Sequence, residues 1–264
     1  MTSSRESATA TNRPTSSADG SLRKIALVAG LGLLIMALLA PFAVFGVLET
    51  LVVSGHPTAT FINISTSEGL FRSGIAAFLI VIMLDVVVAW ALYVLLRPVN
   101  RNVALLTAWL RLGFAAVFAS ALINLLDAAQ LVAGAEQSTL QPEQLHAEVM
   151  SSIASFDYGW TGIALAIFAL HLFGLGYLLF KSADFPKFLG VLVILAGGGY
   201  LIDSFGTILV PEYALTIGVF TFVGEAFLIV WLFWRAIKGL PSGTDAEGRQ
   251  ETEKIPDHSN SLAD

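Results

Sequence analysis

The sequence contains no cysteine and few charged residues. Of its 264 residues, 13% are charged and 56% are hydrophobic, whereas a typical soluble domain carries about 25% charged residues. The absence of cysteine excludes disulfide bonds, thiolate catalysis and cysteine-ligated metals. The shortage of charge indicates that most of the surface faces something other than water, which is typical of membrane proteins.

The 14 lysine and arginine residues occur largely in pairs beside long apolar runs. Such pairs are Arg23/Lys24, Arg97/Arg101, Lys181/Lys187 and Arg235/Lys238, and the intervening connections have almost no basic residue. Because cytoplasmic loops carry an excess of Lys and Arg, this alternation predicts a multi-pass protein of the inner (cytoplasmic) membrane. It places both the N and the C terminus in the cytoplasm.

Six apolar runs are each long enough to span a hydrocarbon core of about 30 Å. They predict an all-α fold, a six-span transmembrane helix bundle over residues 23–238. The expected spans are about 25–53, 72–96, 103–132, 158–180, 188–210 and 213–237. The first run exceeds the length of a secretory signal core, so we expect it to be retained rather than cleaved.

Both ends of the chain are polar. Residues 1–22 are rich in Ser, Thr and Ala and predict a disordered cytoplasmic extension. Residues 239–264 hold six acidic against two basic residues, a net charge of −4, and predict an acidic disordered cytoplasmic tail. The acidic balance, without a basic stripe, argues against nucleic acid as a partner.

Local signals refine the helix ends. Pro41 lies inside the first span and should kink it. Ser65-Thr66-Ser67-Glu68 is typical of a helix N-terminus and should cap the second span. The stretch Gln141-Pro142-Glu143 could begin a short surface helix that runs to Ile153 in the longest outer loop.

Ionisable side chains in apolar spans cost about 2.5–3.5 kcal/mol each near the bilayer centre and often mark function. Counted from the cytoplasmic turns, Asp85, His171 and Glu225 lie about 15–20 Å deep, and Asp203 lies in the outer half of the membrane. The candidate ligand-binding or ion-pathway residues are Asp85, Arg111, His171, Asp203 and Glu225; the secondary polar candidates are Asn124, Asp127, Tyr200 and Thr221. The alternative interpretation is that these groups form interhelical hydrogen bonds that only hold the bundle together.

Arg111 has two interpretations. Its long stem could reach back to the cytoplasmic headgroups, or it could pair with Asp85 or Glu225 across the bundle, since an unpaired buried charge is disfavoured. If His171 is neutral, two of the three acids Asp85, Asp203 and Glu225 lack a cationic partner. They must then hold protons or face a water-filled cavity that admits a cation, although protonated carboxyl groups could equally be structural.

Asp85 and Asp203 each follow an apolar pair in the middle helix of their half of the chain. An inverted repeat would place two aspartates in this way, but the residues around them do not support an alignment of the two halves of the chain. The patterns H-E-x-x-H, G-x-S-x-G and G-x-x-x-x-G-K-[ST] are missing from the sequence. A single deep histidine is more often structural than a metal ligand, so the sequence predicts neither a metal site nor a cofactor.

Several segments resemble the family catalogued as domain of unknown function 4386. They are Glu68-Gly-Leu-Phe-Arg72, Asp85, Leu92-Tyr93-Val-Leu-Leu-Arg-Pro-Val-Asn100, Arg111, His171, Gly176-Tyr177-Leu-Leu-Phe-Lys181, Tyr200-Leu-Ile-Asp203-Ser204 and Pro211. The resemblance covers about residues 23–238. It implies a polytopic bacterial membrane protein without an assigned activity, and it includes no motif at Glu225.

Three functions remain open. The leading hypothesis is a protein that binds or transports a proton, a cation or a small polar solute through intramembrane carboxylates. The alternative is a non-transporting membrane sensor or partner-binding subunit, in which the buried polar residues are structural. An intramembrane enzyme acting on a lipid or isoprenoid ranks last, because no nucleophile–base pair is visible. The lipid bilayer is the expected partner in each case, and an oligomer is possible.

Overall fold

The computed structural model describes residues 15–238 except 211, 214, 216 and 218–222. This part of the chain is helical and contains no strand, as expected for an all-α protein. The predicted terminal extensions, apart from residues 15–22, lie outside the described residues, and so does Thr221.

The first span consists of α1 (Thr15–Pro41), a π-helical segment (Phe42–Leu48) and α2 (Glu49–Leu51). α1 therefore begins inside the stretch expected to be disordered. The π-helical segment starts directly after Pro41, which lacks the backbone N–H that a regular helix would use. The helical run ends before Gly55, whose φ of 76° is a conformation that glycine adopts without strain.

A short helix that the sequence did not predict, α3 (Pro57–Thr66), precedes α4 (Glu68–Leu96). Ser67 is the residue that caps α4, but its side chain makes no capping hydrogen bond. Ser65 and Thr66 instead donate to the carbonyl oxygen of Ile62 within α3. The expected capping box is therefore wrong, because α3 takes up the hydroxyl groups that would have formed it.

α5 (Arg101–Ala133) is joined to α4 by a short turn. The side chain of Asn100 caps it by accepting from the backbone N–H groups of Asn102 and Val103, both at 3.1 Å. A single 3-10 turn (Ala135–Gln137) follows α5. The short connection makes α4 and α5 antiparallel neighbours.

The expected outer surface helix and the fourth span form one continuous helical run. α6 (Pro142–Asp157), a π-helical segment (Tyr158–Ala164) and α7 (Leu165–Lys181) follow one another without a break. In the π-helical segment the carbonyl oxygen of Thr161 accepts from the Ser204 hydroxyl at 2.8 Å. The expectation of a helix ending at Ile153 is wrong, because nothing after Ile153 interrupts the backbone.

α8 (Lys187–Leu209) and α10 (Val223–Lys238) complete the described fold. Five helical runs in this part of the chain are long and apolar enough to cross a membrane: 20–51, 68–96, 101–133, 142–181 and 187–209. Large apolar side chains point away from the protein on these helices, for example Leu38, Met83 and Trp109 at 61–65% exposure. Such an apolar exterior suits lipid rather than water.

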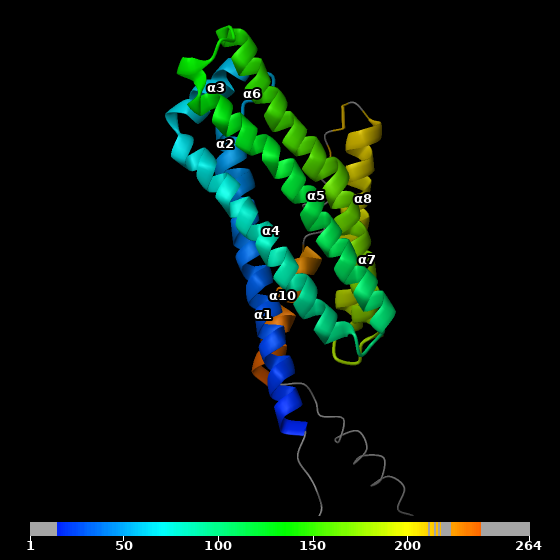
Figure 1. Ribbon diagram of the computed structural model, residues 1–264. Coiled ribbons are helices and arrows are strands. Elements are labelled where there is room, and N and C mark those ends of the chain that lie inside the picture. The colour runs from blue at the N-terminus through cyan, green and yellow to red at the C-terminus, as the bar shows by residue number, and fades with distance from the viewer. Residues whose placement is uncertain (1–14, 211, 214, 216, 218–222, 239–264) are drawn as a thin grey trace, which may run out of the picture.

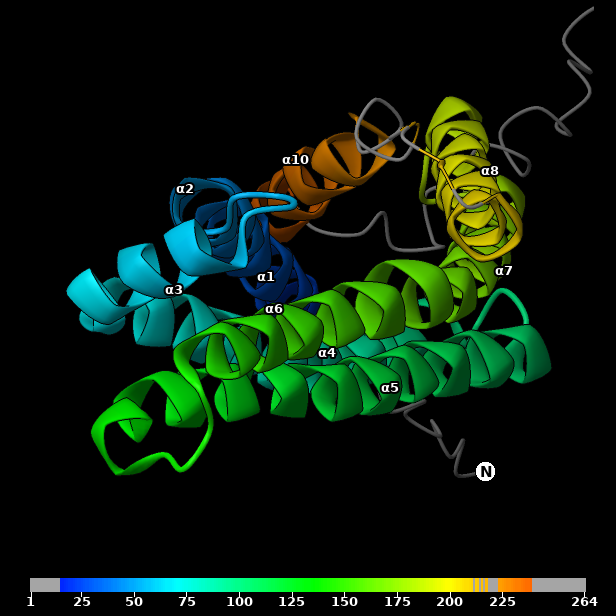
Figure 2. The same cartoon turned by 90° about the horizontal axis from the view of Figure 1, so that it is seen from above.

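The long helices pack in sequence around a common interior. α1 packs on α4, α4 on α5, α5 on α7, α7 on α8, and α10 lies between α8 and α1. Figure 1 shows the helices running roughly side by side, and Figure 2, seen from above, places α10 on the side away from α5. α10 therefore closes the circuit of helices.

α7 and α8 approach each other closely. A side chain on Gly176 would lie 2.7 Å from the carbonyl oxygen of Gly190, and one on Gly190 would lie 2.6 Å from that of Gly176. Both positions require glycine, because the two backbones approach too closely for a Cβ atom. This contact fixes α7, which carries His171, against α8, which carries Tyr200 and Asp203.

Candidate functional site

Arg111 lies at the centre of the buried polar residues. Its side chain on α5 is almost completely buried, and its Nη2 atom lies 2.8 Å from Oδ1 of the fully buried Asp85 on α4. Arg111 therefore does not extend to the headgroups. Because both charges are removed from water, each depends on the other for compensation.

His171 on α7 holds Arg111 from a third helix. Its Nδ1 atom lies 2.8 Å from the carbonyl oxygen of Thr107, and its Nε2 atom lies 3.2 Å from Nη1 of Arg111. A carbonyl oxygen can only accept, so Nδ1 carries the proton; guanidinium can only donate, so Nε2 accepts. These two partners together require a neutral His171 protonated at Nδ1.

Tyr200 and Glu225 extend the cluster to α8 and α10. The Tyr200 hydroxyl donates to Oε1 of Glu225 at 3.1 Å. Phe168 lies between this pair and Arg111: its ring centre is 5.5 Å from Cζ of Arg111 and 5.8 Å from the ring centre of Tyr200. The charge of the Glu225 carboxylate is coupled to the charges of Arg111 and Asp85.

Six of the described helices, α1, α4, α5, α7, α8 and α10, each contribute one side chain to this centre. The contribution of α1 is Met36, whose sulfur lies 4.0 Å from Nη2 of Arg111. We call the set the Arg111 cluster; it consists of Met36, Asp85, Arg111, His171, Tyr200 and Glu225. Residues far apart in the sequence thus converge inside the circuit of helices.

The Arg111 cluster contains more acid than base. Asp85 and Arg111 neutralise each other, and His171 is neutral, so an ionised Glu225 would leave one uncompensated negative charge. In this centre both carboxylate oxygens of Asp85, Arg111 Nε and Thr107 Oγ1 have no hydrogen-bond partner, although Asp85 Oδ1 faces Arg111 at ion-pair distance. Buried polar atoms normally find a partner in protein or ordered water, so this centre has unused capacity to bind.

A small cavity adjoins the cluster on the side of the basic turns. Its volume is about 10 Å³, and its lining includes Thr107 and His171 together with Tyr93, Leu96 and Ala104. A space of this size is near the lower limit for one water molecule. The cavity therefore offers no room for a solute beside the Arg111 cluster.

Aromatic rings fill the bundle on the opposite side of Arg111. On α5, Phe114 and Phe118 follow Arg111 toward the end of the bundle away from the basic turns, and Phe114 contacts Phe168 with ring centres 4.8 Å apart. The aromatic cluster consists of Phe78, Phe114, Phe118, Phe156, Trp160 and Phe168, with neighbouring ring centres 4.8–6.3 Å apart. Rings in such contact leave a dry, closely packed layer.

Asp203 is not part of the Arg111 cluster. Its Oδ1 atom accepts from the Tyr213 hydroxyl at 2.7 Å and from the backbone N–H of Ile217 at 3.0 Å. Both donors belong to the segment that follows α8. These two hydrogen bonds tie Asp203 to the segment after α8, although its charge also acts on Tyr200, three residues earlier on the same helix.

The secondary candidates have different surroundings. Tyr200 belongs to the Arg111 cluster. Asn124 donates to the carbonyl oxygen of Ala121 in its own helix, at 3.0 Å. Asp127 is exposed and lines an open outer pocket of about 450 Å³ together with Glu148. Neither Asn124 nor Asp127 reaches the buried centre.

Sequence reasoning missed Met36, a member of the Arg111 cluster, and two groups that contact the cluster, Phe168 and the carbonyl group of Thr107. Methionine and phenylalanine do not stand out in an apolar span. A backbone carbonyl group is present at every residue, so its use cannot be read from the sequence. The one available signal was the position of Phe168 three residues before His171, on the same helix face.

Comparison with known proteins identifies a family. Residues 28–236 match the family described as "Domain of unknown function (DUF4386)". An uncharacterised protein of Archaeoglobus fulgidus is 35% identical over 165 residues, which cover 62% of this chain and 83% of that protein. No solved structure matches the chain.

Proposed function

The chain belongs to the DUF4386 family, and we propose that it is a six-span inner-membrane protein that binds and moves protons through the Arg111 cluster. The proposal has two parts. The first concerns the topology, and the second concerns the charge that the buried centre needs.

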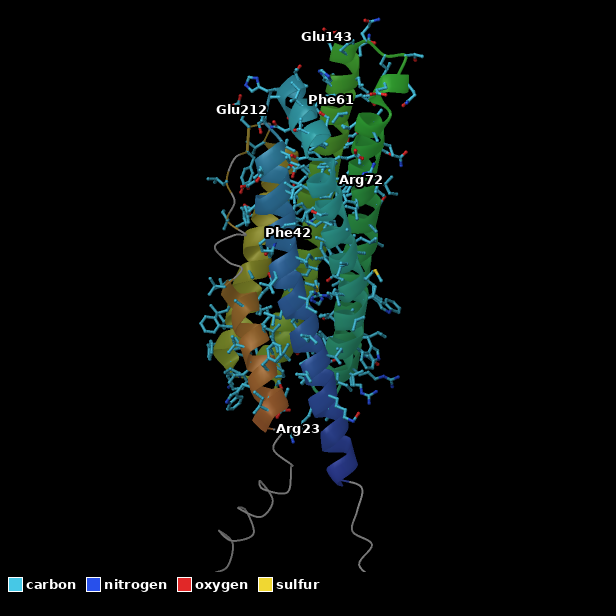
Figure 3. All side chains as sticks on the ribbon, turned by 90° about the vertical axis from the view of Figure 1, so that its left-hand side faces the viewer. Arg23, Phe42, Phe61, Arg72, Glu143 and Glu212 are labelled. Carbon is cyan, nitrogen blue, oxygen red and sulfur yellow. The ribbon has the colours of Figure 1, made fainter. Side chains whose placement is uncertain are left out.

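The sixth span consists of α10 and the apolar residues before it, about 213–237. α10 by itself has 16 residues, which is short for a crossing that needs about 20. Figure 1 supports an even number of crossings, because α1 begins and α10 ends at the same end of the bundle. Figure 3 places Arg23 at that end and Glu143 and Glu212 at the other, so the basic end faces the cytoplasm.

The observation that carries the proton-binding proposal is the charge balance of the Arg111 cluster. Two carboxyl groups, Asp85 and Glu225, share one permanent cation, Arg111, while the hydrogen bonds of His171 require its neutral form. In a low-dielectric interior a lone negative charge is strongly disfavoured. A proton held by Glu225 would remove this charge, and Glu225 is therefore the group that we propose takes it up.

The size of the space beside the cluster favours a proton over a larger ligand. The adjoining cavity measures about 10 Å³, whereas a metal cation needs several oxygen ligands around it and a solute needs still more room. A proton requires no space beyond the carboxyl group that holds it. The Tyr200 hydroxyl, which donates to Glu225, orients this carboxyl group.

A flux experiment tests the proposal. The purified protein is reconstituted into liposomes that contain a pH-sensitive dye, and a potassium diffusion potential drives proton entry. We expect flux in the wild type and at least a tenfold loss in Glu225→Gln, which keeps the shape of the side chain but cannot ionise. The matched control, Asp127→Asn, alters an exposed outer carboxylate and should keep wild-type flux. Replacing sodium by choline should change nothing.

Two results would contradict this proposal. Equal flux in the wild type and Glu225→Gln would remove Glu225 from the pathway, and sodium-dependent flux would favour a cation instead.

The closed aromatic cluster favours a second function, a non-transporting sensor or partner-binding subunit. Such a protein would show no flux above that of empty liposomes.

A further inference from the structure

The cytoplasmic end of α10 is held by a residue from another helix. Arg23 on α1 donates through Nε to the carbonyl oxygen of Ala236 at 3.1 Å and through Nη2 to that of Ile237 at 2.7 Å. The last carbonyl groups of a helix have no partner within the helix. Arg23 therefore caps α10 from outside and ties it to α1.

A second contact ties the same end to the α7–α8 turn. Arg235 on α10 forms an ion pair with Asp184, a residue of that turn. Arg235 is 7% exposed, whereas the Asp184 side chain is 44% exposed, so the pair joins the interior of the bundle to its surface. The Ser182 hydroxyl accepts from the backbone N–H of Asp184 at 3.1 Å and shapes the turn.

Together these contacts hold the helix that carries Glu225. α10 packs on α1 and α8, and the two contacts attach it to these same two neighbours at its end: Arg23 to α1, and Asp184 to the turn that leads into α8. On the far side of the Arg111 cluster the aromatic cluster closes the bundle. The cytoplasmic end is therefore where a movement of α10 would admit water.

We propose that Arg23, Asp184 and Arg235 form a clamp that gates access from the cytoplasm to Glu225. With the clamp closed, α10 stays against α1 and α8 and the Arg111 cluster stays dry. With it open, the end of α10 moves outward and Glu225 exchanges its proton with water on that side. This inference rests on the proposed function, since it states how Glu225 is reached.

The absence of native cysteine allows a direct test by thiol labelling. Leu228 lies one helical turn from Glu225 toward the clamp and is 2% exposed, so Leu228→Cys reports whether water reaches this depth. The reagent is a charged, membrane-impermeant methanethiosulfonate added to vesicles that expose the cytoplasmic face. The labelling rate does not depend on proton flux, so gating can fail while the effect of Glu225→Gln on flux stands.

The variants isolate the clamp. In the Leu228→Cys background, we expect Arg235→Gln and Asp184→Asn each to raise the labelling rate at least tenfold. Exchanging the charges, with Asp184→Arg and Arg235→Asp together, should lower the rate again toward that of the intact clamp. Arg101→Gln, which alters an exposed arginine at the same end of the bundle, is the matched control and should have no effect.

A second reporter separates gating from loss of the fold. Ala121 is 5% exposed and lies on the outer side of Arg111, so Ala121→Cys should remain unlabelled when the clamp is opened. The inference is overturned if Arg235→Gln leaves the Leu228→Cys rate unchanged or if Arg101→Gln raises it equally. It is also overturned if the Ala121→Cys rate rises as much, because the whole bundle would then be open.

Discussion

Asp85 and Asp203 occupy comparable places in the sequence but very different places in the structure. Each follows an apolar pair in a long apolar helix. Asp85 is fully buried and faces the guanidinium of Arg111 at 2.8 Å. Asp203 is half-buried and accepts from two neutral donors, the Tyr213 hydroxyl and the Ile217 N–H group.

The difference shows that depth in the membrane does not decide what a carboxyl group does. Asp85 belongs to a set of side chains from six helices, so its charge is coupled to Arg111 and to Glu225. Asp203 belongs to a local connection between α8 and the residues that follow it. We therefore expect changes at Asp85 to affect the whole bundle and changes at Asp203 to affect one connection.

The largest effect should follow loss of Arg111. Arg111→Met keeps the length of an apolar stem but leaves the buried Asp85 without a cation. Removing one partner of a buried ion pair costs about 3–5 kcal/mol, so the free energy of unfolding in detergent should fall by that order. Denaturant unfolding followed by tryptophan fluorescence measures it.

The double variant sharpens this expectation. Arg111→Met combined with Asp85→Leu removes both charges, and it should recover most of the lost stability because no lone charge remains. The control Arg101→Met alters an exposed arginine on the same helix and should cost no more than about 0.5 kcal/mol. Equal costs for the two arginines would mean that the Asp85–Arg111 pair is not the centre of the bundle.

Replacing each aspartate by asparagine compares directly how much the two carboxylates contribute to stability. Asp85→Asn removes the negative charge opposite Arg111 but keeps an oxygen that can accept from the guanidinium, so it should cost about 1.5–3 kcal/mol. Asp203→Asn keeps an oxygen that can accept from Tyr213 and Ile217, so it should cost about 1 kcal/mol or less. The same unfolding measurement applies to both. If Asp203→Asn cost more, the distinction drawn between the two sites would be reversed.

Loss of His171 should have an intermediate effect. His171→Leu removes the nitrogen that accepts from Arg111, leaving a buried donor unsatisfied at a cost of about 1–3 kcal/mol. His146→Leu is the matched control: His146 is half-buried at the end of the bundle away from the basic turns and lies tilted against Phe61, with ring centres 4.3 Å apart. It should cost less in the same unfolding assay, since leucine retains apolar contact with Phe61.

The sequence was most informative where apolar runs end at basic turns. The predicted spans 103–132 and 188–210 agree closely with α5 (Arg101–Ala133) and α8 (Lys187–Leu209). It was least informative at the outer end, where α3 was missed and α6 was expected to end early. Polar residues there conceal the helices, because tertiary contacts such as that between Phe61 and His146 stabilise them.

The candidate site was only partly predictable. Charged residues in apolar runs are visible to counting, and Asp85, Arg111, His171 and Glu225 do converge. Which acid would pair with Arg111 could not be read from the sequence, since Asp85 and Glu225 lie at similar depth and the rotation of each helix about its axis is set by packing. The separate position of Asp203 depends on the segment after α8, whose path the sequence does not reveal.

A small effect should come from Tyr213, one of the neutral donors to Asp203. Tyr213→Phe removes one hydroxyl while the Ile217 N–H group, at 3.0 Å, still satisfies the same carboxylate oxygen. Loss of a neutral hydrogen bond should cost about 0.5–1.5 kcal/mol, measured as above. Tyr177→Phe, at a tyrosine that is 42% exposed, is the control and should be close to neutral. A cost for Tyr213→Phe as large as that of Asp85→Asn would contradict the comparison, because neutral donors would then hold Asp203 as firmly as a buried cation holds Asp85.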